Sequence, residues 1–362
     1  MTSFQLDPNF DRMKKAFTLQ GEPDKVPIAE IYIDPFIKER FLGRPVVDLE
    51  DNVEFYYRAG YDFVELRQGF GILMGNDYGH HHPSSHVSFT AVSDDTQPKQ
   101  KRVWAEEHAG IIVDKDTLER FPWPRLDDFS FEAFENVGRC LPAGMKVIAV
   151  GGKIFSAAWE LMGFETFCLN TILNVGLVQR LISKIAELQL AVFERMASYD
   201  TVGAMWLADD LAYSSGLMIS PSFFRQHLFP YFVEYKKICQ KYGLPLLYHS
   251  DGNITEVIDD LIQCGVNAIH PIEPKVMDIF EIKSKYGAKL CLIGNIDVGE
   301  TLTRGTRERV RSEVINKIRR LAPGGGYCLG SSNAITNYVK FDNYIAMLET
   351  VRDCGSYPIS LI

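Results

Sequence analysis

Short apolar runs alternate with amphipathic helical segments through the second half of the chain. The runs lie at 244–248, 266–269, 290–293 and 327–329. Each is rich in β-branched or aromatic residues and ends directly in polar residues, at 249–253, 270–274, 294–297 and 330–333. This alternation is typical of parallel β/α units. Residues at the carboxyl ends of such strands face the active site, so the pattern predicts an enzyme.

The first half of the chain continues the pattern. Further strands are predicted at 26–33, 61–65, 145–150 and 204–207, with helices at 48–59 and 186–199. No linker or change of composition divides the chain. We therefore predict an α/β protein with a single domain over residues 1–362, a (β/α)8 TIM barrel.

Residues 69–115 interrupt the rhythm after the second strand and are rich in Gly, His, Ser and Thr. Alternating polar and apolar residues around 87–90 and 101–104 predict a β-hairpin within this stretch. Insertions of this length usually act as lids or binding loops. We expect the 69–115 insertion to lie over the active-site face.

Composition narrows the range of functions. The chain has 362 residues, is 46% hydrophobic and carries a net charge of −9, which argues against a nucleic acid as its main partner. The sequence contains no apolar stretch long enough to span a membrane and no secretory signal pattern at its start. Its seven cysteines are scattered without a Cys-x-x-Cys motif, so we expect a reduced, cytoplasmic protein.

Several motifs resemble the uroporphyrinogen decarboxylase superfamily. They are His-Ser-Asp-Gly-Asn at 249–253, Gly-Asn-Ile-Asp at 294–297, Leu-Ala-Pro-Gly-Gly-Gly-Tyr at 321–327 and Leu-Gly-Ser-Ser-Asn at 329–333, together with segments 209–221 and 224–230. The resemblance covers most of the chain and implies the same barrel fold, with a homodimer as the expected assembly. The superfamily contains both decarboxylases and corrinoid-dependent methyltransferases, so it leaves the reaction open.

The chain departs from the decarboxylases at the positions that hold their substrate. Those enzymes carry Met-Arg-Gln-Ala-Gly-Arg after the first strand, where this chain has an acidic and apolar segment, 30–38. Their aspartate at the end of the second strand is also missing. The histidine of their last strand is replaced by Ser331 or Ser332. A cofactor-free decarboxylase is therefore the alternative function, and a non-catalytic tetrapyrrole-binding relative is a third possibility.

The chain also departs from the methyltransferases of the superfamily. Members that methylate coenzyme M hold zinc with a His-x-Cys motif after the fifth strand and a Cys after the eighth. This chain has His249-x-Asp251 and Ser331 at those places, so both thiolates are replaced. A site of oxygens and imidazole is harder than a thiolate site and suits an oxygen-bearing substrate.

Demethylating methyltransferases of the superfamily are associated with another zinc pattern, Glu, fourteen residues, Glu, twenty residues, His. The chain contains this spacing as Glu50, Glu65 and His86, which are the predicted metal ligands. Glu50 also suits the first turn of a helix without any metal. His80, His81 and His82 compete with His86 for the role of ligand.

A rival metal site combines His249 and Asp251 with Asp209 or Asp210. Apart from the metal ligands, the predicted catalytic residues are Asp209, His249 and Asp251. Strand-end positions and the loop after the second strand predict a substrate-binding set, which consists of Arg67, Lys153, Trp159, His270, Asn295 and Ser331.

The resemblance and the residues together predict a zinc-dependent O-demethylase. This enzyme would take the methyl group of a small methoxylated aromatic compound, an aryl methyl ether. It would transfer that group to the cobalt of a corrinoid. Because the chain contains no corrinoid-binding module, the corrinoid is expected on a separate carrier protein.

Overall fold

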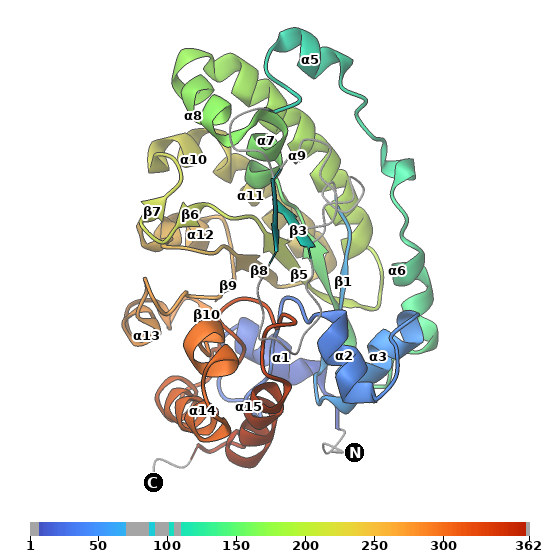
Figure 1. The fold of residues 1–362 in the computed structure, drawn as a ribbon, viewed down its shortest axis with the longest axis vertical. Coiled ribbons are helices and arrows are strands. Elements are labelled where there is room, and N and C mark those ends of the chain that lie inside the picture. The colour runs from blue at the N-terminus through green and yellow to red at the C-terminus, as the bar shows by residue number, and fades with distance from the viewer. Residues whose placement is uncertain (1–6, 70–86, 91–100, 105–109, 360–362) are drawn as a thin grey trace.

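A computed structural model of the chain describes residues 7–69, 87–90, 101–104 and 110–359. Its centre is one sheet of parallel strands in the order β1-β4-β5-β8-β9-β10-β11. Figure 1 labels most of these strands. The strands are β1 (Phe63–Arg67), β4 (Lys146–Gly151), β5 (Val202–Ala208), β8 (Leu246–His249), β9 (Ala268–His270), β10 (Cys291–Ile293) and β11 (Tyr327–Cys328). These seven strands are the second to eighth predicted strands. The parallel α/β architecture is confirmed.

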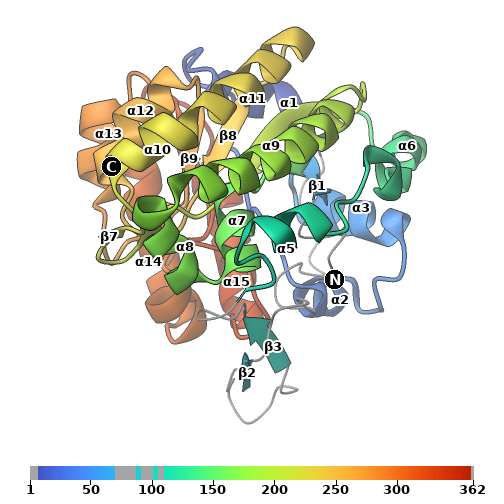
Figure 2. The same cartoon turned by 90° about the horizontal axis from the view of Figure 1, so that it is seen from above.

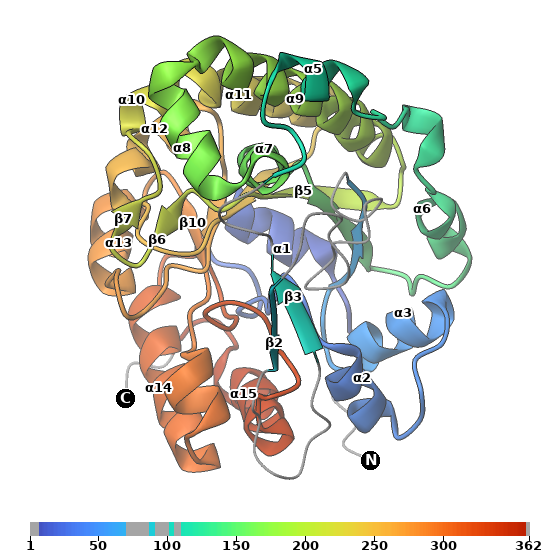
Figure 3. The same cartoon turned by 45° about the horizontal axis from the view of Figure 1, so that its top comes forward.

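The first predicted strand, 26–33, is present as isolated parallel bridges. Ile28 pairs with Leu329, and Ile33 pairs with Ile335. On its other side the segment meets β1, because Nη2 of Arg67 donates a hydrogen bond to the main-chain oxygen of Ile31 (2.9 Å). Segment 26–33 therefore lies between the two ends of the sheet, which curls with its helices on the outside (Figure 3).

Helices follow most strands and cover the outer face of the sheet (Figure 2). The helices are α1 (Phe10–Phe17), α2 (Pro35–Leu42), α3 (Leu49–Arg58), α5 (Lys115–Arg120), α6 (Glu132–Asn136), α7 (Phe155–Met162), α8 (Phe164–Leu173), α9 (Val175–Ala197), α10 (Pro221–His227), α11 (Phe229–Tyr242), α12 (Ile258–Gln263), α13 (Ile279–Tyr286), α14 (Arg307–Leu321) and α15 (Phe341–Cys354). Short 3₁₀ segments lie at Leu126–Asp128, Val137–Arg139 and Thr255–Val257, and a π-helical turn at Val298–Thr303.

The longest helix, α9, illustrates how the sequence makes these elements. Asn174 caps its start by accepting a hydrogen bond from the main-chain N–H of Leu177. Leu177, Leu181 and Ile185 recur at every fourth position and are all buried. Such spacing places them on one face of the helix, where α9 packs against β4 and β5.

The predicted hairpin within the insertion is present as an antiparallel ladder between β2 (Val87–Thr90) and β3 (Lys101–Trp104). At the end of the insertion, the main-chain N–H of Ile112 donates to the oxygen of Leu161 in α7 (2.9 Å), and Ile112 is fully buried. Residues 70–86, 91–100 and 105–109 lie outside the described part of the chain.

Candidate active site

Asp210, His249 and Asp251 come together where β5 and β8 end. Ala208, the last residue of β5, pairs with His249, the last residue of β8, so the residues that follow both strands are neighbours. Nε2 of His249 lies 3.7 Å from Oδ1 of Asp210 and 3.8 Å from Oδ1 of Asp251. These distances are too long for hydrogen bonds. Atoms that bind the same cation are somewhat farther apart than hydrogen-bonded atoms, and these distances fit such an arrangement.

Each of the two carboxylates is held in place by a donor from another loop. The main-chain N–H of Asp251 donates to Oδ1 of Asp210 (2.8 Å), and Nδ2 of Asn333 donates to Oδ2 of Asp251 (2.7 Å). Oδ1 of Asp251 is buried and has no hydrogen-bond partner among the described residues. Burial and the nearby Asp210 raise the pKa of Asp251 well above its ordinary value. A cation bound between the carboxylates would relieve both costs.

This cluster is the one group of three His, Cys, Asp or Glu side chains that could share a cation in the described part of the chain. Its donors are two carboxylates and one imidazole, a hard set that fits Zn²⁺ and other divalent ions. Burial lowers the pKa of His249, which favours the neutral form that can act as a ligand. The side chains of Asp210 and Asp251 are partly exposed, although Oδ1 of Asp251 is itself buried.

His270, at the end of β9, contacts His249 directly. Their Nδ1 atoms lie 2.8 Å apart, and the strands pair His249 with His270 in register. The His270 ring also meets the Trp206 ring edge-on, with centroids 5.2 Å apart. His270 therefore lies beside the cluster, and the contact that it makes there is with the imidazole of His249.

Asp209 has a different environment from its neighbour Asp210. Its carboxylate accepts hydrogen bonds from the main-chain N–H groups of Ile154, Phe155 and Ser156, at 2.7–2.9 Å. These groups form the start of α7, so Asp209 anchors that helix to the end of β5. Burial raises the pKa of Asp209 to about 6 in spite of these bonds. Its contacts are those of a structural anchor.

Lys153 and Trp159 are held beside the site by α7 and the turn before it. The ammonium group of Lys153 pairs with Glu160. Trp159 meets the ring of Phe164 edge-on, and Phe164 meets that of Tyr213 in the same way, with centroids 5.6 and 5.7 Å apart. The main-chain oxygen of Tyr213 accepts from the N–H of Asn253 (3.0 Å), so the chain at the end of this row of rings lies next to the Asp251 loop.

The Asp251 loop approaches the chain around Tyr213 very closely at Gly252. Gly252 has a φ of +78°, and a Cβ atom there would lie 2.5 Å from the main-chain oxygen of Ala212. Only glycine fits both the left-handed backbone and this approach. The glycine of the 249–253 motif therefore serves the packing of the site.

Glu65, a predicted metal ligand, and Arg67, of the predicted substrate-binding set, contact each other. Nε of Arg67 pairs with Glu65, and its guanidinium lies over the ring of Tyr32, 5.1 Å from the centroid. Glu50 is exposed in the first turn of α3. His86 lies outside the described residues, as do His80, His81 and His82, so the complete set of Glu50, Glu65 and His86 has no described geometry.

Ser331 and Asn295 are both buried and already engaged. Ser331 donates from its main-chain N–H (2.8 Å) and its hydroxyl (2.5 Å) to Glu30, a residue of the first predicted strand that is not in the predicted substrate-binding set. Burial raises the pKa of Glu30 to about 8. Asn295 donates to the main-chain oxygen of Ile272, while its own Oδ1 is buried without a hydrogen-bond partner among the residues described. Asn333, which was also missed, lies in the Leu-Gly-Ser-Ser-Asn motif that could have signalled it.

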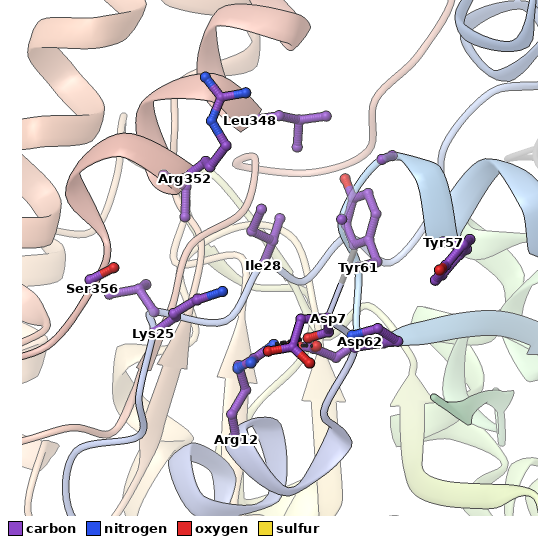
Figure 4. A pocket seen from close by; sticks show the side chains of 15 residues that line it. Asp7, Arg12, Lys25, Ile28, Tyr57, Tyr61, Asp62, Leu348, Arg352 and Ser356 are labelled. Carbon is purple, nitrogen blue, oxygen red and sulfur yellow. Dashed lines mark hydrogen bonds and ion pairs between the residues drawn. The ribbon is translucent and has the colours of Figure 1, made fainter. Parts of the chain in front are cut away.

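A cavity of about 130 Å³ lies elsewhere, at the amino ends of the strands (Figure 4). Arg12 of α1 pairs there with Asp62, the residue before β1, and with Asp24. Lys25, Tyr57 and Arg352 also line the cavity. Side chains at the amino ends of barrel strands contribute to stability, and the guanidinium of Arg12 is already paired with two carboxylates. We therefore do not assign the cavity to catalysis.

Comparisons with known proteins agree with the motifs. Residues 106–354 match the family model described as uroporphyrinogen decarboxylase (URO-D). The chain is 26% identical over 225 residues to the methylcobamide:CoM methyltransferase MtaA from Methanosarcina barkeri, and 26% identical over 229 residues to MtaA from Methanosarcina barkeri strain Fusaro. Each match covers 60% of this chain and spans 62% of the relative's length.

The fold has a solved counterpart. A methyltransferase from Methanosarcina mazei superposes with a TM-score of 0.67 at 18% identity, covering 96% of this chain and 99% of that chain. Across the described part of the chain, no helix combines the length and the apolar character needed to cross a membrane. Since the family model matches more than half of the sequence, the chain belongs to the uroporphyrinogen decarboxylase (URO-D) family.

Proposed function

We propose that this protein is a corrinoid-dependent methyltransferase that takes a methyl group from an aryl methyl ether. The observation that carries the proposal is the cluster of Asp210, His249 and Asp251 at the ends of two neighbouring strands. Similarity to enzymes named methylcobamide:CoM methyltransferases supports the class of reaction. The departure from their thiolate pattern supports the class of substrate.

The proposed metal is Zn²⁺, held by Asp210, His249 and Asp251. Two carboxylates supply the negative charge that a dication needs, and the neutral imidazole supplies the third ligand. When bound, zinc would withdraw electron density from the ether oxygen and so improve the phenolate as a leaving group. The partly exposed side chain of Asp210 is where that oxygen would reach the metal.

The aryl ring of the substrate has a candidate surface in the row of Trp159, Phe164 and Tyr213. Stacked and edge-on contacts with such rings bind a flat aromatic group without fixing its substituents. Lys153 and Arg67 lie on neighbouring elements, and their ion pairs with Glu160 and Glu65 would offer polar groups to substituents of the ring. We assign His270, Asn295 and Ser331 to the wall behind the ligands.

The methyl acceptor in this proposal is cobalt in a corrinoid carried by a separate protein. The carrier would approach the face where the strands end, since the ligands lie there. Insertion 69–115 would then cover the substrate over the same face. A homodimer is the expected assembly, as the resemblance to the family implies.

Glu50, Glu65 and His86 form the alternative zinc site. The contact between Glu65 and Arg67 favours the Asp210 cluster, because the guanidinium already neutralises Glu65. Metal analysis of ligand variants separates the two sites, as described in the Discussion.

The function is tested with purified protein, Zn²⁺, a methoxybenzoate and cob(I)alamin as the acceptor. Methyl transfer converts cob(I)alamin to methylcobalamin, which is followed by absorbance. We expect transfer that requires zinc and falls at least about a hundredfold in His249→Ala, since a ligand that binds the reacting centre is lost. Zinc-independent release of carbon dioxide from a carboxylated porphyrinogen, with no methyl transfer, would instead establish the decarboxylase.

A further inference from the structure

The contact between His249 and His270 joins two nitrogens of the same kind. Their Nδ1 atoms lie 2.8 Å apart, which is hydrogen-bond distance. One Nδ1 must therefore carry the proton and the other must accept it. The position of this proton decides whether Nε2 of His249 presents an N–H group or a lone pair to Asp210 and Asp251.

The surroundings of His270 do not decide which nitrogen is the acceptor, because His270 is 1% exposed and its Nε2 has no hydrogen-bond partner among the described residues. The assignment rests on the far side of His249. If Nδ1 of His270 is the acceptor, His249 donates from its own Nδ1, and Nε2 of His249 carries no proton.

The distances on the far side of His249 favour this tautomer. Nε2 of His249 stands 3.7 and 3.8 Å from the nearest oxygens of Asp210 and Asp251. A proton on Nε2 would be expected to draw at least one carboxylate to hydrogen-bond distance. A bare nitrogen beside two carboxylates is instead arranged to share a cation with them.

We propose that His270 is a positioning residue that fixes the tautomer and the ring orientation of His249, so that Nε2 of His249 is presented as a metal ligand. The proposal rests on the proposed metal site. Its physical basis is general, since the second nitrogen of a metal-binding histidine usually donates to a fixed acceptor. What is unusual in this chain is that the acceptor is another imidazole rather than a carboxylate or a main-chain oxygen.

Two variants of nearly equal size isolate this role. In His270→Asn, Oδ1 of the amide replaces the Nδ1 acceptor. His270→Leu has the same shape as His270→Asn but no acceptor. Both variants leave a similar cavity beside Trp206, so a difference between them reports the hydrogen bond and not the packing.

The measurement is a titration of the metal-free full chain with Zn²⁺ against a competing chelator. We expect zinc affinity to fall about 10- to 100-fold in His270→Leu and to stay within roughly threefold of wild type in His270→Asn. Equal affinities in the two variants would overturn the positioning role. Circular dichroism on both variants checks that they fold.

A second measurement uses the wild-type protein alone. Nitrogen NMR of histidine-labelled protein without metal should show His249 protonated at Nδ1 and bare at Nε2, and His270 with the opposite pattern. A proton on Nε2 of His249 would refute the assignment even if zinc binds. Wild-type protein that binds no zinc would instead overturn the metal site of the proposed function, and NMR would still decide the tautomer.

Discussion

The main-chain N–H of Asp251 donates a hydrogen bond to Oδ1 of Asp210 at 2.8 Å. This bond joins the loops that follow β5 and β8 and brings two carboxylates together beside one imidazole. Like charges at such short range repel, and the main-chain donor offsets only part of that repulsion. A proton on Asp251, whose pKa is raised well above its ordinary value, removes the repulsion in the metal-free chain, and the proposed cation would take the place of that proton.

Replacing ligands separates the two proposed zinc sites. His249→Ala should weaken zinc binding at least about tenfold, because water replaces one of three protein ligands. Glu65→Gln should retain zinc, since Glu65 is paired with Arg67. Zinc per chain, measured by elemental analysis, gives the answer. Loss of zinc from Glu65→Gln with full retention in His249→Ala would move the site to Glu50, Glu65 and His86.

The buried Glu30 should make stability depend on pH. Its pKa is about 8 in the folded chain and near 4.5 when unfolded, so the folded state favours the protonated carboxyl. The protonated carboxyl contributes to the free energy of unfolding in full below pH 4.5, and this contribution is lost as the pH rises through 8. Relative to wild type, Glu30→Gln should therefore gain stability between pH 5 and pH 9, on the order of 3 kcal/mol.

Urea unfolding of both proteins across this range measures the effect. Glu187→Gln is the control, because the Glu187 side chain is 80% exposed and should follow the wild-type curve. A constant difference between Glu30→Gln and wild type at all pH values would show that Glu30 does not titrate in this range.

The strand ends could be read from the sequence, but the roles of adjacent residues could not. Asp209 and Asp210 both follow β5, and the sequence treats them as equivalent. The structure assigns Asp209 to the start of α7 and Asp210 to His249, because neighbouring residues in an extended segment point in opposite directions. Which of the two side chains points into the site depends on how α7 packs, and the local sequence pattern does not predict that packing.

Contacts distant in sequence were harder still to foresee. Glu30 and Ser331 are 301 residues apart and meet only because segment 26–33 pairs beside β11. His249 and His270 were each predicted from their strand ends, and their register follows from adjacent parallel strands. The bond between their rings depends on side-chain rotation, which sequence spacing does not determine.

The ion pair between Arg12 and Asp62 should contribute to stability without affecting catalysis. Both side chains are buried at the amino ends of the strands, and burial raises the pKa of Asp62 to about 6. Arg12→Leu should cost about 3–5 kcal/mol, because it leaves a buried carboxylate without its partner. Chemical denaturation at pH 7.5 measures the loss.

The matched control for Arg12 is Arg44→Leu. Arg44 pairs with Asp51 but its side chain is 44% exposed, so its loss should cost far less stability than the loss of Arg12. Adding Asp62→Asn to Arg12→Leu should recover part of the lost stability. No recovery would show that the effect comes from the packing of α1 and not from the stranded charge.

Replacing Asp251 by cysteine tests this position as a ligand directly. Asp251→Cys creates a thiolate donor two residues after His249, the spacing of the coenzyme M-methylating relatives. Cobalt(II) bound to the wild-type site should have only oxygen and nitrogen ligands, whereas the variant should add an intense thiolate-to-cobalt absorption band. The softer site should also bind zinc more tightly than the wild type and lose preference for oxygen-bearing substrates. Asp259→Cys is the control, because Asp259 belongs to α12 and not to the cluster. A thiolate band that is missing from Asp251→Cys, while cobalt still binds, would exclude position 251 from the metal site.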